Sequence, residues 1–187
     1  MSQFYRVLPD PKANQRWYLK SPVDSNGQEV DPRSFTSCNR YESVLPLRLP
    51  IRRDGKPVAF NFCDFDMIVT QKYLNNALQD LVGNSIQRIP VEVDASEEKY
   101  EILNVLDAVE CISEGRSEFT KWTEDSGRPD KIGQFRMITK LFIDPEKARA
   151  HTIFRVKEWK IALIIDESVK RLLEKNSASS IIFQPVN

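Results

Sequence analysis

Residues 121–137, KWTEDSGRPDKIGQFRM, combine many of the side chains that perform chemistry or bind partners. The stretch contains one indole, three acids and four bases, with two glycines and a proline between them. Arg128, Asp130 and Lys131 are close enough in sequence to surround a small polar substrate, as they would in an enzyme. No activated nucleophile and no tuned acid-base pair accompanies them. A binding or structural role therefore fits this stretch better than catalysis.

Motifs for other chemistry are missing from the sequence. His151 is the single histidine, which excludes a metal site built on two histidines and favours a place in a turn or in the core. The glycine spacing does not match a phosphate-binding loop, and EDSGRPD lacks the alternating ligands of a calcium loop. The cysteines are odd in number and form no C-x-x-C pair, so no disulfide framework or zinc site is predicted. We expect no catalytic residue, no metal and no cofactor.

Residues 121–137 are open to two interpretations. Gly127 can supply the positive φ of a turn, and Pro129 holds Arg128 extended, so that its guanidinium points toward Glu124 or Asp130. The first interpretation is a rigid, internally paired surface loop with Trp122 over its base. The second adds a protein partner, because Trp and Arg are enriched at binding hot spots. The candidate contact residues here are Trp122, Glu124, Asp125, Arg128, Asp130 and Lys131.

Charge is balanced over the whole chain and uneven along it. The 27 basic residues equal the 27 acidic residues, so a general affinity for nucleic acid is disfavoured. Residues 92–118 nevertheless hold nine acids against two bases. A block of this kind is commonly a solvated face, and it is also suited to meeting a basic partner. The candidate contact residues in the block are Glu97, Glu98, Glu114 and Glu118.

The apolar pattern argues against secretion and against membrane insertion. The start, MSQFYRVLPD, lacks the basic and apolar regions of a signal peptide. No apolar run approaches the roughly 20 residues of a membrane span. We therefore expect a cytoplasmic protein that does not bind a membrane.

Two segments of the chain share one pattern: a short apolar strand, an amphipathic helix, a polar turn and a second strand. Their helices are predicted over residues 70–82 and 166–175, with Thr70 and Asp166 as N-caps. Gly83 suits the end of the first helix. Two unrelated units would look much the same, and we favour coincidence over an old duplication.

The remaining elements are predicted to be mostly strands. Asp54-Gly55 between two apolar runs predicts a hairpin, and the nearby Pro46, Pro50 and Pro57 predict edge or irregular strands. Residues 86–93 and 100–112 are expected to pair, and Asp144-Pro145 starts one helical turn. The sum is a strand-rich α+β domain over residues 1–187, with a mostly antiparallel sheet and two main helices.

Several stretches resemble, in the same order and over nearly the whole chain, a bacterial family formerly classed as a domain of unknown function. That family belongs to the predicted immunity proteins of polymorphic toxin systems. The stretches that carry the resemblance are RWYLKSPVDSNGQEVDPRSF, VAFNFCDFDMIVTQKY, RIPVEV, YEILNVLDAVECISEGRSEFTKW, GRPDKIGQFRMITKLFIDPEKA, IFRVKEWKIALIIDESVKRLLE and IIFQPV. No single stretch is diagnostic, and their combination is what is specific.

The resemblance implies a cytoplasmic, non-enzymatic antitoxin that binds a cognate toxin domain and blocks its active site or its fold. A nuclease is the toxin class that we favour, because the acidic block would then mimic phosphate in a basic cleft. Lysine at Glu97, Glu98, Glu114 and Glu118 would then slow association and weaken its salt dependence. Two alternatives stay open: an adaptor of a secretion system that recognises a component or its own copy as a homodimer, and an enzyme of unrecognised class.

Overall fold

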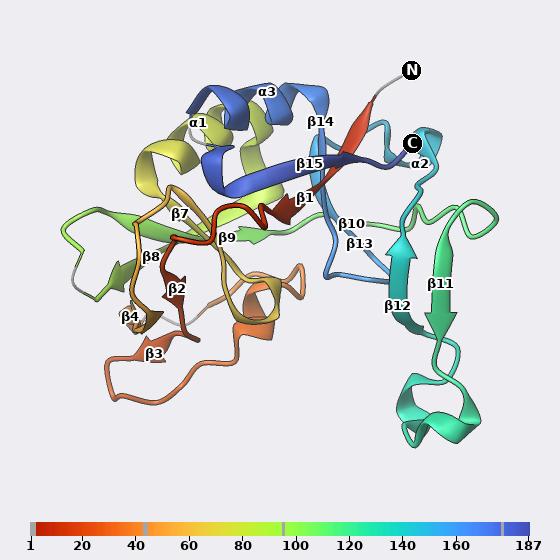
Figure 1. The fold of residues 1–187 in the computed structure, drawn as a ribbon, viewed down its shortest axis with the longest axis horizontal. Coiled ribbons are helices and arrows are strands. Elements are labelled where there is room, and N and C mark those ends of the chain that lie inside the picture. The colour runs from red at the N-terminus through yellow and green to blue at the C-terminus, as the bar shows by residue number, and fades with distance from the viewer. Residues whose placement is uncertain (1–2, 43–44, 95, 177) are drawn as a thin grey trace.

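Two large β-sheets carry most of the strands in the computed structural model of the chain (Figure 1). The structure describes residues 3–42, 45–94, 96–176 and 178–187. In spatial order, the larger sheet contains β3 (Val23–Asp24), β4 (Leu47–Leu49), β8 (Ile86–Val93), β9 (Tyr100–Val105), β7 (Ile68–Gln71) and β6 (Phe60–Phe62). The five-stranded sheet contains β10 (Ala108–Val109), β13 (Ile153–Val156), β14 (Leu163–Asp166), β1 (Phe4–Pro9) and β15 (Ile181–Pro185).

Two small sheets complete the strand pairing. One pairs β2 (Tyr18–Leu19) with β5 (Ile51–Arg53), and the other pairs β11 (Glu118–Lys121) with β12 (Phe135–Lys140). Over the described residues, the strand pairs are antiparallel except β4 with β8 and β10 with β13. The α+β class with mostly antiparallel pairing is confirmed.

The two main helices lie side by side on one side of the large sheets (Figure 1). Helix α1 spans Lys72–Val82 and helix α3 spans Glu167–Asn176, which confirms both predicted helices. Each buries one stripe of apolar side chains, such as Leu74 and Leu78 on α1 and Val169 and Leu173 on α3. The amphipathic pattern is therefore explained by packing against the sheets.

The two similar segments have the same topology. Strands β7 and β8 are joined by α1 and both pair antiparallel with β9, which lies between them. Strands β14 and β15 are joined by α3 and both pair antiparallel with β1. Each unit is thus a strand-helix-strand unit split by one inserted strand.

Capping of the helices follows prediction at two of three positions. Asp166 Oδ1 accepts a hydrogen bond from the Val169 amide at 2.9 Å, and Asp144 Oδ1 caps the short helix α2 (Pro145–Ala148). The prediction for Thr70 is wrong, because Thr70 lies buried in β7 and its hydroxyl donates to Asn75 Oδ1 at 2.6 Å. Gln71 takes the N-cap position instead, without a side-chain bond. Gly83 has the expected positive φ, 55°.

The predicted hairpin at Asp54-Gly55 does not form. Strand β5 pairs with β2, and β6 pairs with β7. Gly55 is needed for another reason: a Cβ there would lie 2.5 Å from the carbonyl carbon of Arg16. Pro46, Pro50 and Pro57 lie outside the strand bounds, but β4 is no edge strand because β3 covers its outer side.

One apolar cluster joins both large sheets to both helices. Its members include Val7 from β1, Leu74 from α1, Leu103 from β9 and Ile165 from β14. A second cluster, around Phe154, lies under the small sheet of β11 and β12. Burial of apolar surface in these two clusters thus stabilises the two large sheets and the base of the small one.

Candidate functional site

The strands β11 and β12 form an arm at one end of the molecule, and its tip extends away from the large sheets (Figure 1). We use "the arm" for residues 118–140 and "the arm tip" for residues 122–134. The tip is closed at its base by two backbone hydrogen bonds, from the Trp122 amide to the Gln134 carbonyl and from the Gly133 amide to the Trp122 carbonyl, both at 2.9 Å. Phe119 and Phe135 anchor the arm by packing against the second cluster.

Local hydrogen bonds hold the arm tip. The Thr123 amide donates to Ser126 Oγ at 3.1 Å in a capping box, and Gly127 follows with a φ of 67°, as predicted. Arg128 then donates two hydrogen bonds to the carboxylate of Asp130, at 2.9 and 2.8 Å. Of the two acids expected for Arg128, the structure therefore selects Asp130. The first interpretation, an internally paired loop, describes this geometry.

Trp122 lies at the base of the arm tip, as predicted, and basic side chains stack on it. Lys131 Nζ lies 5.4 Å from the ring centroid, and the guanidinium carbon of Arg136 lies 5.0 Å from it. Such cation–π contacts contribute about 0.5–1 kcal/mol at exposed sites. They fix the ring while leaving Trp122 half-buried.

The arm also exposes two large apolar side chains that the sequence analysis did not single out. Ile132 is 49% exposed and Met137 is 51% exposed. Their place in an alternating strand and a polar turn gave no signal, because exposure depends on which face of the arm is left uncovered. Together with Trp122 they give the arm apolar surface beside its charges.

The acidic block of residues 92–118 does not form one face. Six of its nine acids pair with basic side chains, all of which lie outside residues 92–118 in the chain and one of which is a histidine. The pairs are Asp94–Arg48, Glu101–Arg88, Asp107–His151, Glu110–Lys157, Glu114–Lys121 and Glu118–Lys140. Glu92, Glu97 and Glu98 have no ion pair among the described residues.

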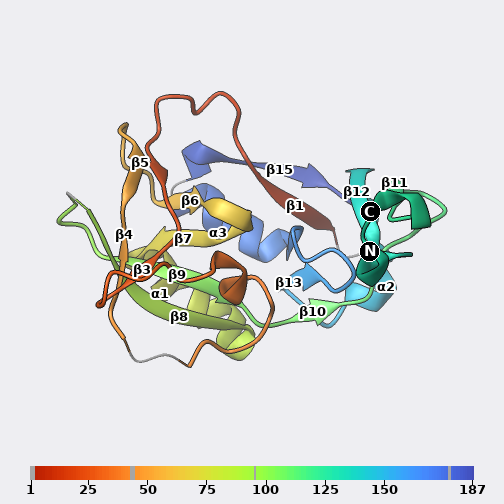
Figure 2. The ribbon, with the colours of Figure 1, turned by 90° about the horizontal axis from the view of Figure 1, so that it is seen from below.

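The four candidate acids lie at two ends of the molecule. Glu97 and Glu98 lie at the connection between β8 and β9, whereas Glu118 lies on the arm and Glu114 pairs with Lys121 of the arm (Figures 1 and 2). The structure therefore places Glu118 and the six candidates of residues 122–131 on the arm, with Glu114 paired to it, and it separates Glu97 and Glu98 from them. A single charge-reversal experiment on all four acids would mix two surfaces.

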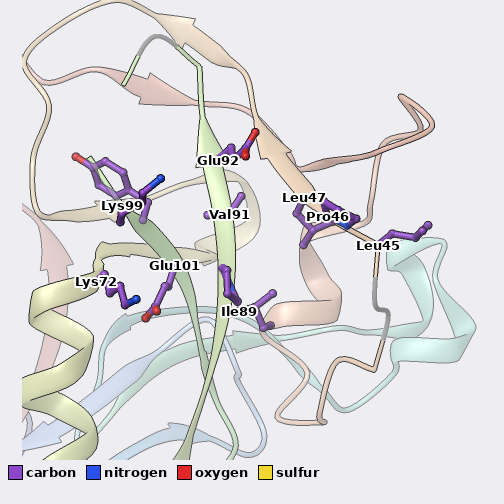
Figure 3. A pocket seen from close by; sticks show the side chains of 11 residues that line it. Leu45, Pro46, Leu47, Lys72, Ile89, Val91, Glu92, Lys99 and Glu101 are labelled. Carbon is purple, nitrogen blue, oxygen red and sulfur yellow. The ribbon is translucent and has the colours of Figure 1, made fainter. Parts of the chain in front are cut away.

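A groove of about 500 Å³ lies beside the connection between β8 and β9 (Figure 3). Leu47, Ile89 and Val91 give it apolar walls, and Lys72 and Lys99 stand at its rim. Glu101 also lines the groove, but Arg88 and Asn75 occupy its carboxylate. The acid that lies deepest in the groove is thus already used by the fold.

Two of the three groups considered for catalysis, Arg128 and Asp130, are held in an ion pair with each other. The hydrogen bonds between Arg128 and Asp130 raise the pKa of Arg128 and lower the pKa of Asp130, so both stay charged. A general acid or base needs the opposite change, toward neutrality. His151 Nδ1 lies 3.0 Å from Asp107 Oδ2, which also accepts from the Ser85 hydroxyl at 2.9 Å. This contact joins three connecting segments and agrees with the structural role expected for His151.

The family comparison gives the class of the protein. A sequence model of the "Immunity protein family (Imm11)" matches residues 90–187, and the chain belongs to this family. The match covers just over half of the chain, less than the nearly complete coverage that the resemblance implies. It includes the arm and the second strand-helix-strand unit. Family membership indicates a toxin-neutralising role, with a protein toxin as the partner and inhibition in place of catalysis.

No curated protein matches the chain. Over the described residues, no helix is long and apolar enough to cross a lipid bilayer.

Proposed function

We propose that this chain is a cytoplasmic immunity protein that binds a cognate toxin domain of a polymorphic toxin system and blocks its active site. The arm is the contact surface that we assign to the toxin. The observation that carries this assignment is the arm, whose tip is ordered by its own hydrogen bonds and which exposes Ile132 and Met137 in addition to half-buried Trp122. The family supplies the role, and the arm supplies a place for it.

The order of the arm tip favours binding. A loop that is already fixed loses less conformational entropy on docking than a flexible loop does. The bidentate pair of Arg128 and Asp130 and the cations on Trp122 fix the tip without help from the core. Trp, Met and Arg are also among the residue types enriched at interfaces.

Three acids of residues 92–118 have no ion pair among the described residues, and they suit a basic partner. A nuclease is the favoured class of such a partner. Glu97 and Glu98 lie in the segment that connects β8 and β9, and Glu92 lies near the end of β8 that leads into it, away from the arm. Unpaired acids raise the rate of encounter with a basic surface at low salt. We propose that these three residues, and not the whole acidic block, steer the toxin domain.

The whole chain, residues 1–187, is the unit that we propose for this function. Val7, Leu74 and Phe60 from the first half pack in one cluster with Leu103 and Ile165 from the second half. The part that the family match covers therefore shares its core with the part that precedes it.

Co-expression tests the proposal. The toxin domain encoded beside the gene of this chain is expressed with and without the protein, and survival and co-purification are measured. The wild type is expected to restore growth and to co-purify with the toxin domain. Aspartate at Ile132 and Met137 is expected to weaken the complex about tenfold or more, because charge replaces apolar contact at the arm.

A matched control is Leu81→Asp, since Leu81 is 41% exposed on α1 and lies outside the arm. It is expected to leave the affinity unchanged. Growth rescue by the wild type without any complex would contradict the proposed function and favour an enzyme that reverses damage. Equal weakening by the arm variants and by Leu81→Asp would remove the arm from the contact.

A further inference from the structure

The turn between β6 and β7, residues 63–67, has a backbone that its sequence does not favour. The Met67 amide donates to the Asp64 carbonyl at 3.2 Å, and the two residues between them have positive φ, 53° for Phe65 and 57° for Asp66. This is the geometry of a type I′ turn, which prefers Asn or Gly at these positions. A bulky side chain such as that of Phe65 is a marked exception in the left-handed region. The fold therefore holds Phe65 in place against its local preference.

A buried arginine holds this turn. Arg155 on β13 is 0% exposed, and its Nη2 donates to the Asp66 carbonyl at 2.9 Å. Its Nη1 donates to the carbonyl of Lys160, in the turn between β13 and β14, at 2.7 Å. One guanidinium thus fixes two turns that are far apart in sequence. Both turns lie on the side of the molecule that Figure 2 faces.

These two turns expose apolar side chains next to each other. Phe65 is 53% exposed and Ile161 is 45% exposed, and both line a cavity of about 360 Å³. The other residues that line the cavity are Arg33, Thr36, Ser37, Asp66 and Lys160. Cys38, which follows Ser37, has a φ of 64°. All three non-glycine residues with positive φ in the described part of the chain therefore belong to segments around this cavity.

The cavity has basic surroundings. The guanidinium carbon of Arg33 lies 3.6 Å from the centroid of the Phe65 ring, and Lys160 Nζ donates to the Ser37 carbonyl at 2.8 Å. Arg33 also contacts Asp31 at 3.4 Å, in an exposed pair that contributes little. Below the surface, the one carboxylate of the cavity, that of Asp66, faces both Arg6 and Arg155. Positive charge is thus in excess over the acids that line the cavity.

An exposed aromatic ring on an unfavourable backbone needs an explanation beyond folding. Asn or Gly at Phe65 would suit the turn better, and the ring covers little of the core. Strained residues of this kind concentrate at binding sites, where a fixed geometry reduces the entropy lost on binding. The basic side chains next to Phe65 and Ile161 suit a partner that carries acids beside an apolar residue.

We propose that residues 63–67 and 157–162, together with Arg33 over the Phe65 ring, form a second contact surface for the toxin domain. Phe65 and Ile161 receive an apolar side chain of the toxin, and Arg33 and Lys160 bind carboxylates that flank it. This inference rests on the proposed function, and it adds an acidic, apolar-tipped segment to what the toxin must present.

The test measures the affinity of the purified protein for the toxin domain encoded beside its gene, by calorimetry. Phe65→Asn keeps the turn favourable and removes the ring, so the affinity is expected to fall at least about tenfold while the melting temperature does not fall. Ile161→Gln is expected to weaken the complex in the same direction, and it serves as a second variant if the first does not fold. Leu81→Gln, on α1, is the control and is expected to bind as the wild type does.

Charge is tested separately. Glutamine at Arg33 and Lys160 is expected to weaken binding and to reduce its salt dependence, since acidic groups on the toxin lose their partners. Wild-type affinity for both Phe65→Asn and Ile161→Gln overturns the inference and leaves the proposed function intact. Stronger binding after Arg33→Gln and Lys160→Gln would show a basic partner here and also overturns it. Absence of a wild-type complex overturns both proposals.

Discussion

The arm tip and the turn of residues 63–67 both expose apolar side chains, but they are stabilised in opposite ways. The arm tip follows local rules: glycine stands at the positive φ of residue 127, and Arg128 pairs with its neighbour Asp130. The turn breaks local rules with Phe65 at positive φ, and buried Arg155 holds it from below. The comparison teaches that exposure alone does not mark a binding residue. Exposure kept at the expense of local stability is the stronger sign of selection for binding.

Removal of the buried Arg155 should give the largest difference in stability between the two regions. Arg155→Ala is expected to lower the free energy of unfolding by about 3 kcal/mol, because it leaves a cavity and two carbonyls without their donor. Arg128→Ala, in the arm tip, is expected to change it by less than about 0.5 kcal/mol. Urea denaturation of both variants measures the difference. Similar small losses for both would mean that Arg155 does not hold the turn.

Substitutions at the positive-φ residues should change the free energy of unfolding in opposite directions in the arm tip and in the turn of residues 63–67. Gly127→Ala is expected to lower the free energy of unfolding by about 1 kcal/mol, because alanine disfavours the left-handed region. Phe65→Asn is expected to raise it by about 0.5 kcal/mol, since relief of strain exceeds the lost contact with Arg33. Thermal unfolding measures both. A clear loss of stability in Phe65→Asn would make the ring a structural residue.

The acids of the two turns should respond to pH in opposite directions. Burial raises the pKa of Asp66, although Arg155 and Arg6 oppose the shift, whereas the hydrogen bond from Arg128 lowers the pKa of Asp130. An acid with a raised pKa in the folded state loses stability as pH rises through the interval between its ordinary and raised values. An acid with a lowered pKa contributes stability above its ordinary pKa and loses it as pH falls toward the lowered value.

Asp66→Asn is therefore expected to be more stable than the wild type at pH 7, and Asp130→Asn less stable, with both differences shrinking below about pH 4. Melting temperatures of both variants and the wild type, at pH 7 and below about pH 4, measure these differences. The same sign for both variants at pH 7 would contradict the assigned environments.

Charge reversal at the connection between β8 and β9 should have the smallest effect on binding. Lysine at Glu97 and Glu98 is expected to slow association with the toxin domain by about several-fold at low salt, because the electrostatic attraction during encounter is lost. The free energy of unfolding is expected to stay unchanged. Lysine at Glu114 and Glu118 should act mainly by breaking the pairs with Lys121 and Lys140. Stopped-flow association at two salt concentrations separates the two. An unchanged association rate for the variant with lysine at Glu97 and Glu98 would mean that the connection between β8 and β9 is an ordinary solvated surface.

Sequence reasoning succeeded where local chemistry decides structure. The apolar stripes of α1 and α3, the cap at Asp166, the turn at Gly127 and the pairing of Arg128 with a near neighbour were all readable from spacing. These features depend on residues a few positions apart. The family resemblance, which the family match supports over residues 90–187, rested on similar short stretches.

Sequence reasoning failed where distant segments decide. Asp54-Gly55 has the residues of a hairpin turn, yet Gly55 is there to let the backbone at Arg16 approach. The hairpin between β6 and β7 uses Phe65-Asp66 in place of the Asn or Gly that such a turn prefers, and Arg155 supports it from another sheet. The acids of residues 92–118 likewise do not form one face, because several of them pair with basic residues distant in sequence, which no local pattern predicts. An aromatic residue between two aspartates, at a break in an apolar run, was the one clue to the turn.

Titration of the toxin activity is the most direct test of the claim that this protein acts by binding. A fixed amount of the toxin domain is incubated with increasing amounts of the protein, and the remaining activity is measured. The account predicts a linear fall that reaches complete inhibition at about one protein per toxin domain, as expected for tight binding at concentrations above Kd. Complete inactivation by far less than one equivalent would contradict it, because only a catalyst acts repeatedly.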